Sequence, residues 1–278
     1  LRQAGVRDLT ILERGAAVGG VWHHNTYPGA ACDVPSHLYS YSFAPNPDWG
    51  RRFATQPDIQ RYVEDTARRF GVLDSVRCAT EVTGAAWDAE QERWEVQTSA
   101  GPLSADLLVA ACGQLTRPAI PHVEDIDAFA GPAFHSSQWR HDLDLRGLRV
   151  GVVGTGASAI QLVPQIQPLV ASLTVVQRTP PWILPKFDRA YRPRANAAFA
   201  RLPALQRAGR LGWWTALEAG IAGFVGHEQA LAPLAALSRA HLRRQVPDPR
   251  LRERLTPTYR IGCKRILLSS DWYPALSQ

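Results

Sequence analysis

The stretch "RVGVVGTGASAIQ", residues 149–161, decides the fold. It reads as an apolar strand followed by residues at helical spacing. Between the two lies the pattern G-x-G-x-x-A, formed by Gly154, Gly156 and Ala159. The first glycine of such a turn permits the tight bend, the second lets a pyrophosphate approach, and the small third residue allows close helix packing. The stretch predicts an α/β fold with a dinucleotide-binding turn, against the alternative of a plain strand-to-helix turn.

The end of the next predicted strand indicates which dinucleotide is bound. That strand lies in "SLTVVQRTPPW", residues 172–182, and places Arg178 and Thr179 where an NAD site would have an acid for the ribose hydroxyls. An arginine can instead hold a 2′-phosphate through charge-assisted hydrogen bonds. The sequence therefore predicts that this half binds NADP(H).

A second strand of the same kind lies near the beginning of the chain. "LTILERG", residues 9–15, is an apolar run typical of a buried parallel strand, and it ends in Glu13. An acid at that point suits a ribose without a 2′-phosphate, so FAD is the expected ligand. Its own glycine loop would lie about 20 residues upstream of the acid. The sequence is therefore interpreted as a fragment truncated at the front, and we expect the same at the back.

The composition excludes several classes of protein. The chain has 278 residues and a formal net charge of +6, but its arginines are scattered rather than clustered, so no nucleic-acid partner is predicted. The four cysteines form no C-x-x-C pair, and no metal site is expected. No apolar run is long enough to span a membrane. A cytoplasmic location is expected, although a targeting signal could precede residue 1.

The remaining patterns predict the other elements. A helix is expected over residues 56–72, antiparallel strands over 81–106, a buried strand over 107–111, and helices from about 194 to 245. Residues 18–43 are expected to be too irregular for a helix. The apolar stretch at 212–226 is expected to pack in a core, and 259–276 to hold a loop and a short strand. A Pro-rich connector covers residues 114–129.

One further motif carries a family resemblance. Phe129, Gly131, His135 and Trp139 spell F-x-G-x-x-x-H-x-x-x-W. With this fingerprint the sequence resembles the type I Baeyer–Villiger monooxygenases, within the class B flavin-containing monooxygenases. The resemblance extends over "GGVWHHNTYPGAACDVPS", "YSYSF", "ACGQL", "GTGASAIQ", "QRTP" and "GCKR". Arg140 and Ala31 depart from what the family often has at those places.

The resemblance implies two Rossmann-like domains of the flavin monooxygenase type. Residues 1–117 would form the FAD-binding domain without its first glycine loop, and residues 118–140 a connector with the fingerprint. Residues 141–278 would form the NADP-binding domain, with a helical insertion at about 189–245. His135 and Trp139 would then act as a hinge that senses bound NADP, which predicts that His135→Ala slows oxygenation while FAD content stays normal.

The resemblance also implies the chemistry. In such enzymes NADPH reduces the flavin, O2 adds to give a C4a-peroxyflavin, and oxygen insertion next to a ketone carbonyl gives an ester or lactone. By resemblance Arg265 is the catalytic arginine that stabilises the peroxide, and Asp33 is its carboxylate partner. Without the resemblance, Arg265 would be a surface charge and Asp33 a turn residue.

The cofactor-binding residues are carried over in the same way. The resemblance assigns to FAD the residues Glu13, Gly20, Trp22, Asp33, Tyr39 and Gln114, and to NADP the residues Gly154, Thr155, Gly156, Ser158, Gln161, Arg178, Thr179 and Lys264. Trp22 and Tyr39 as core aromatics, and Lys264 as a solvated side chain, stay open as alternatives.

Other functions also stay open. A flavin monooxygenase that oxygenates nitrogen or sulfur would share part of the fingerprint, and the chain as it stands could be an inactive nucleotide-binding module. The expected partners are a ketone and O2, with no stable membrane insertion. The sequence leaves the identity of the ketone, the regioselectivity and the oligomeric state undetermined.

Overall fold

The computed structural model describes residues 4–6, 8–221, 223–226 and 228–278. The chain divides into two compact units. The first comprises residues 1–26 and 59–138, and the second comprises residues 27–58 and 139–278. This division differs from the predicted domain boundaries, which remain a prediction.

The first unit contains a small parallel pair, a helix and an antiparallel sheet. Strand β1 (Ile11–Leu12) pairs in parallel with β2 (Val76–Arg77), and a single 3-10 turn, η2 (Leu73–Ser75), precedes β2. Helix α2 (Gln56–Arg69) ends near Gly71, as its apolar spacing and glycine predicted. Strands β3 (Val82–Asp88), β4 (Arg93–Thr98) and β5 (Leu103–Ala105) form an antiparallel sheet in chain order, which confirms the expectation for residues 81–106.

Three expectations for the first unit were wrong in part. The run at residues 9–15 gives only the two-residue β1, whose side chains are half-buried. Residues 107–111 lie outside every described strand and are exposed, with Leu107 at 79% and Val109 at 72%. An apolar run needs a pairing strand and a covering layer to be buried, and the described chain supplies neither to residues 107–111. In the segment expected to lack helix, Val21–His24 forms the four-residue helix α1.

Two further 3-10 turns, η3 (Ile126–Ala128) and η4 (Ser136–Gln138), lie in the region predicted as a connector.

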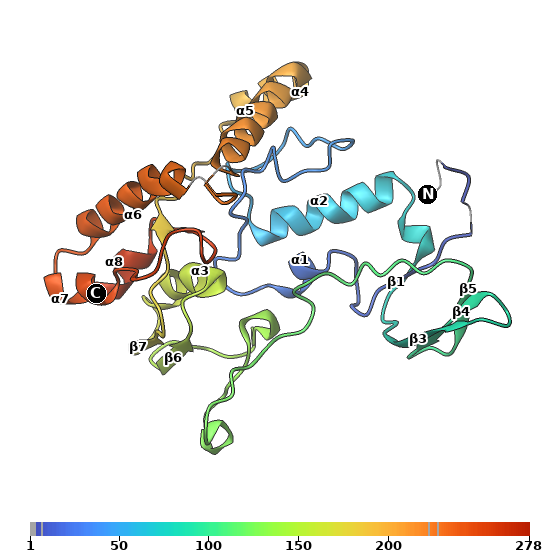
Figure 1. The fold of residues 1–278 in the computed structure, drawn as a ribbon, viewed down its shortest axis with the longest axis horizontal. Coiled ribbons are helices and arrows are strands. Elements are labelled where there is room, and N and C mark those ends of the chain that lie inside the picture. The colour runs from blue at the N-terminus through green and yellow to red at the C-terminus, as the bar shows by residue number, and fades with distance from the viewer. Residues whose placement is uncertain (1–3, 7, 222, 227) are drawn as a thin grey trace. The chain divides into compact units, whose positions relative to one another are not determined.

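The second unit is built on the predicted strand, turn and helix. Strand β6 (Arg149–Val153) pairs in parallel with β7 (Ser172–Val176) over five residues. Helix α3 (Ala157–Ile166) connects the two strands and lies beside them (Figure 1). Its side chains Ile160, Leu162 and Val163 belong to clusters on which Val152 and Leu173 of the two strands pack. The side of α3 that is apolar in the sequence is therefore the side that is buried, and the strand, turn and helix predicted from residues 149–161 are confirmed.

The same core continues into the C-terminal elements. Strand β8 (Ile183–Leu184) pairs in parallel with β9 (Leu267–Leu268). Helices α6 (Ala232–Gln245), α7 (Pro249–Arg254) and α8 (Trp272–Leu276) contribute Leu242, Leu251 and Trp272 to the cluster that holds Ile160 and Val163. Helix α7 begins where the Asp248 carboxylate accepts the N–H groups of Arg250 and Leu251 at 3.0 and 3.3 Å.

The helices expected from about residue 194 to 245 are present as α4 (Pro193–Arg201), α5 (Pro203–Ile221) and the 3-10 turn η5 (Glu228–Leu231), followed by α6. The expectation that residues 212–226 pack in a core was wrong. Trp214 is 51% exposed and Phe224 is 56% exposed. The buried contact of α5 is polar instead: Gln206 Nε2 donates to the Asn46 carbonyl at 2.6 Å and lies 3.0 Å from His37 Nδ1.

No helix within the described ranges is both long and apolar enough to cross a membrane.

Candidate functional site

The glycine turn after β6 offers backbone donors at an open surface. Gly154 has φ +104°, and its N–H donates to the Val176 carbonyl at 2.9 Å. A Cβ atom at Gly154 or at Gly156 would meet nothing within 4 Å. Gly156 is the N-cap of the ten-residue helix α3 and provides no side-chain cap, so the first N–H groups of the helix are left for an external acceptor. This arrangement fits a pyrophosphate group.

Several of the residues expected to bind NADP lie at this turn or at the end of β7. The Thr155 hydroxyl donates to the Thr179 carbonyl at 3.3 Å, which joins the turn to the end of β7. Arg178 is exposed at that end. Lys264 is also exposed, and its ammonium group lies 4.7 Å from the centroid of the Tyr259 ring. Ser158, in the first turn of α3, is half-buried and hydrogen bonded to the Tyr27 side chain.

The two residues expected to be catalytic form an ion pair within the second unit. The Arg265 Nη2 atom lies 2.5 Å from Asp33 Oδ2, although 232 positions separate the residues in sequence. The Asp33 side chain is 25% exposed, while that of Arg265 is 63% exposed. The more buried carboxylate therefore fixes the position of a guanidinium group that still reaches the surface. Such a group remains protonated and can stabilise a negative oxygen atom.

Asp33 is preceded by Cys32, whose thiol is buried and not in a disulfide. Burial raises the pKa of the Cys32 thiol to about 11. The Cys32 N–H donates to the Ala54 carbonyl at 2.9 Å, and the Cys32 sulfur accepts the Val34 N–H at 3.3 Å. Asp33 is therefore carried by a backbone that is held on both sides.

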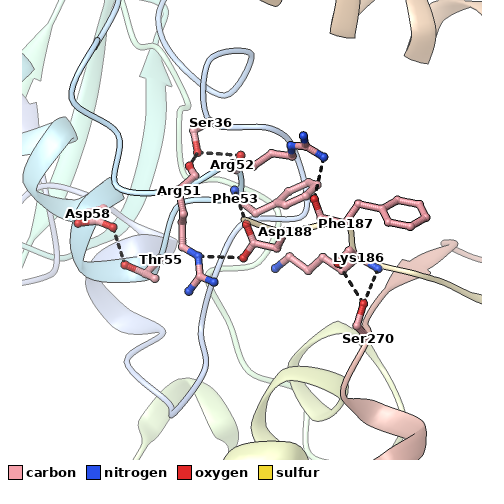
Figure 2. A network of polar contacts seen from close by, with 10 residues as sticks. All are labelled: Ser36, Arg51, Arg52, Phe53, Thr55, Asp58, Lys186, Phe187, Asp188 and Ser270. Carbon is pink, nitrogen blue, oxygen red and sulfur yellow. Dashed lines mark hydrogen bonds and ion pairs between the residues drawn. The ribbon is translucent and has the colours of Figure 1, made fainter. Parts of the chain in front are cut away.

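Lys186 contributes a further positive charge near this segment. Burial lowers the pKa of the Lys186 ammonium group, and charges that act on it include Asp188, Arg51 and Asp33. Its Nζ atom lies 5.1 Å from the centroid of the Phe53 ring. The Lys186 backbone is fixed by the Ser270 hydroxyl, which bonds its N–H at 3.1 Å and its carbonyl at 3.0 Å (Figure 2).

The loop that carries Lys186 also clamps residues 51–53. Arg51 Nε lies 2.8 Å from Asp188 Oδ2, and the Phe53 N–H donates to Asp188 Oδ1 at 3.2 Å (Figure 2). The Arg52 guanidinium donates to the Phe187 carbonyl at 2.8 Å. These bonds tie the segment before α2 to the loop after β8 within one compact unit.

The residues expected to bind FAD are distributed over both units. Glu13, Gly20, Trp22 and Gln114 belong to the first unit, and Asp33 and Tyr39 belong to the second. The Glu13 carboxylate accepts the Gly15 N–H at 2.6 Å. Gln114 is exposed, Trp22 is half-buried and Tyr39 is 39% exposed. The roles of these residues remain a prediction.

The fingerprint residues differ in their surroundings. A Cβ atom at Gly131 would lie 2.7 Å from the Phe129 ring, so a side chain there would displace the ring. His135 Nδ1 accepts the Ser137 N–H at 3.1 Å and lies 2.8 Å from the Ser137 hydroxyl. Trp139 packs, in the second unit, against the cluster of Tyr27, Ala30, Leu162 and Ile166. The boundary between the two units, between residues 138 and 139, therefore lies inside the fingerprint motif.

Sequence reasoning missed two features of this region. Lys186 was given no role, although it is one of only two lysines in a chain rich in arginine, and that rarity was the available signal. The second feature is the pairing of Gln161 with the backbone of Ala31, at 2.9 Å from Nε2 to the carbonyl and 3.3 Å from the N–H to Oε1. No sequence signal relates these two distant positions.

Within the described residues, no group of His, Cys, Asp or Glu side chains is arranged to hold a metal ion.

Comparison with known proteins agrees with this geometry. A family model described as flavin-binding monooxygenase-like matches residues 7–205. A Baeyer–Villiger monooxygenase of Streptomyces coelicolor is 49% identical over the whole chain, which covers 54% of that protein. A Baeyer–Villiger monooxygenase of Pseudomonas aeruginosa is 47% identical over the whole chain and is covered to 53%. The chain thus spans about half the length of these curated relatives.

A solved structure shows the same fold. The crystal structure of OTEMO in complex with FAD and NADP superposes with a TM-score of 0.85 at 26% identity, and the comparison covers 100% of this chain and 60% of that one. The α/β fold of the chain therefore matches a protein that binds both dinucleotides, and the resemblance found in the sequence is confirmed.

Proposed function

The chain belongs to the flavin-binding monooxygenase-like family, and from this premise we propose that it is part of an NADPH- and FAD-dependent Baeyer–Villiger monooxygenase. The reaction inserts an oxygen atom from O2 next to a ketone carbonyl and yields an ester or lactone. The observation that carries the proposal is the Arg265–Asp33 ion pair at 2.5 Å, in a chain 49% identical to a Baeyer–Villiger monooxygenase.

The residues of the second unit would hold NADP(H). The N–H groups at the start of α3 and the open backbone at Gly154 and Gly156 would bind the pyrophosphate. Arg178 and Lys264 would bind the 2′-phosphate, because both are exposed cations. Thr155, Ser158 and Thr179 would line the same path.

FAD, when bound, would supply the activation of O2. Glu13, Gly20, Trp22, Asp33, Tyr39 and Gln114 are the residues proposed to contact it. Arg265 would stabilise the negative charge that develops on oxygen during attack on the ketone, because a guanidinium group carries a positive charge and several N–H donors in a fixed plane. Asp33 would orient Arg265 by accepting one of its N–H groups.

The proposal includes the domain arrangement of the complete protein. Residues 1–117 would belong to a Rossmann-like FAD-binding domain and residues 141–278 to an NADP-binding domain with the helical insertion at about 189–245. Residues 118–140 would connect them, with His135 and Trp139 as the hinge. Trp139 supports this role because it packs on the cluster beside α3. A cytoplasmic location is part of the same proposal.

The test uses the product of the complete gene. The purified protein is supplied with FAD, NADPH, oxygen-18 gas and a cyclic ketone, and the products are analysed by mass spectrometry. We expect a lactone that carries a single labelled oxygen, and at least about tenfold faster turnover with NADPH than with NADH. Arg178→Ala should remove most of that preference. Oxygenation of a thioether without oxygenation of any ketone would contradict the proposal and favour the sulfur-oxygenating alternative.

A further inference from the structure

The side chain of Gln161 joins helix α3 to the segment that carries Asp33. Gln161 Nε2 donates to the Ala31 carbonyl at 2.9 Å, and Oε1 accepts the Ala31 N–H at 3.3 Å. The same oxygen accepts the Tyr27 hydroxyl at 3.0 Å. The amide thus pairs with both backbone groups of Ala31, as a neighbouring strand would. Both lone pairs of its oxygen are used.

Backbone packing supports the same attachment. Gly29 has φ +81°, and a Cβ atom there would lie 2.6 Å from the Gln161 carbonyl oxygen and 2.8 Å from Gln165 Cγ. Only a residue without a side chain allows this approach of the segment to the helix. Tyr27 and Ala30 are buried with Leu162 and Ile166 in the cluster beside it. Residues 27–31 are therefore docked along one face of α3.

The attached segment leads directly to the ion pair. Asp33 lies two residues beyond Ala31, and its carboxylate holds the largely exposed Arg265 at 2.5 Å. Gln161 is also close to the glycine turn in sequence, because it lies in the second turn of the helix that begins after Gly156. One side chain thus connects the candidate phosphate site with the candidate catalytic pair.

We propose that Gln161 is a positioning residue rather than a phosphate ligand. It locks the Asp33 segment to α3, so that the Arg265–Asp33 pair keeps a fixed position relative to the nicotinamide dinucleotide bound at the glycine turn. This inference rests on the proposed function for its catalytic consequence. The lock itself is a property of the chain and can be tested without turnover.

The first measurement is hydrogen exchange of residues 28–35 in the complete protein without added NADP. The variant Gln161→Leu leaves the Ala31 N–H without its acceptor, so exchange in this segment should become at least about tenfold faster. The matched control is Gln167→Leu, the same substitution at the C-cap of the same helix, which should leave exchange unchanged. Equal exchange in the Gln161→Leu variant and the unmodified protein would overturn the proposed lock.

The second measurement separates positioning from cofactor binding. In Gln161→Leu we expect ester formation per NADPH consumed and kcat to fall by about tenfold or more, while KM for NADPH changes by less than about threefold. A tenfold rise in KM for NADPH with kcat preserved would overturn the proposal and make Gln161 a phosphate ligand. If the unmodified protein oxidises no ketone, the proposed function fails, while the exchange result still decides the lock.

A third variant covers the case in which Gln161→Leu does not fold. Gln161→Glu keeps the size of the side chain but places a carboxylate against the Ala31 carbonyl. Because a protonated carboxyl can donate to that carbonyl, coupling in this variant should improve as the pH falls, relative to the unmodified protein. A pH profile parallel to that of the unmodified protein would contradict the lock.

Discussion

Strand β6 and the segment 107–111 were both predicted as strands, and only β6 forms. In β6 each residue from Arg149 to Val153 has a parallel partner in β7, and Val152 packs on the core beneath α3. Residues 107–111 are as apolar, yet Leu107 is 79% exposed and lies in no described strand. The residues of β6 themselves alternate between exposed and half-buried, so burial does not separate the two segments. An apolar run indicates a possible strand, and a neighbouring strand that can pair with it decides whether the strand forms.

The contrast extends to the two predicted dinucleotide sites. The site after β6 is complete within the second unit, because strand, turn, helix and the next strand all contact one another. The site at Glu13 rests on a two-residue strand with half-buried side chains. Substitutions in the second unit should therefore have the larger effects on the stability of this chain.

The largest effect is expected at Gly29. Gly29→Ala forces a Cβ atom to 2.6 Å from a backbone oxygen at φ +81°, and the segment must move off α3. We expect a loss of about 3–5 kcal/mol in the free energy of unfolding, measured by chemical denaturation. Gly147→Ala is the matched control, since Gly147 has φ +74° but open space around it, and it should cost only about 1 kcal/mol. Equal losses would show that α3 does not define the position of Gly29.

A second pair of substitutions compares the surroundings of β6 with those of residues 107–111. Ile160 is 3% exposed beneath β6, so Ile160→Ala should cost about 2–4 kcal/mol. Leu107→Ala should change the stability of the 278-residue chain by less than about 0.5 kcal/mol, because Leu107 is already in solvent. The same substitution is then measured by chemical denaturation of the complete protein. A loss above about 1 kcal/mol in the free energy of unfolding for Leu107→Ala there would show that further chain covers residues 107–111.

The smallest effect concerns the Cys32 thiol beside Asp33. Its pKa in the folded chain is raised from 9.0 to about 11 by burial, so the protonated form is stabilised in the folded state. This contribution to the free energy of unfolding is complete below pH 9 and is lost as the pH rises toward 11, with a limit of about 3 kcal/mol. Cys32→Ala should therefore lose less stability between pH 9 and 11 than the unmodified chain does.

Alkylation provides the corresponding check on reactivity. At pH 8, mass spectrometry should find Cys78, Cys112 and Cys263 modified before Cys32, because those three are exposed. Modification of Cys32 at the same rate would show that the segment beside Asp33 opens readily, which would contradict its docking on α3.

Much of the second unit could be predicted from the sequence. The glycine pattern, the apolar spacing of α3 and the run 172–176 are local signals. The elements that they predict follow one another in the sequence and pack on one another. The exposure of α5 could not be predicted, because its apolar residues indicate a buried face and the sequence does not show what covers it. The grouping of residues 27–58 with the second unit also depends on contacts distant in sequence.

The candidate site was predictable where a motif carried it. The resemblance paired Asp33 with Arg265, and the structure brings them within 2.5 Å of each other. The roles of Gln161 and Lys186 were not predictable in this way, because each depends on how a loop from another part of the chain packs. The amide of Gln161 meets the backbone of Ala31, which carries no sequence-specific signal.

The catalytic role of the Arg265–Asp33 pair is tested most directly by a double-mutant cycle, measured as the rate of ester formation by the complete protein with FAD and NADPH. We expect Arg265→Ala and Asp33→Ala each to slow the reaction by at least about 100-fold, and the double variant to be no slower than the slower single variant. Losses that multiply in the double variant, or a change of less than about twofold in Asp33→Ala, would contradict that role.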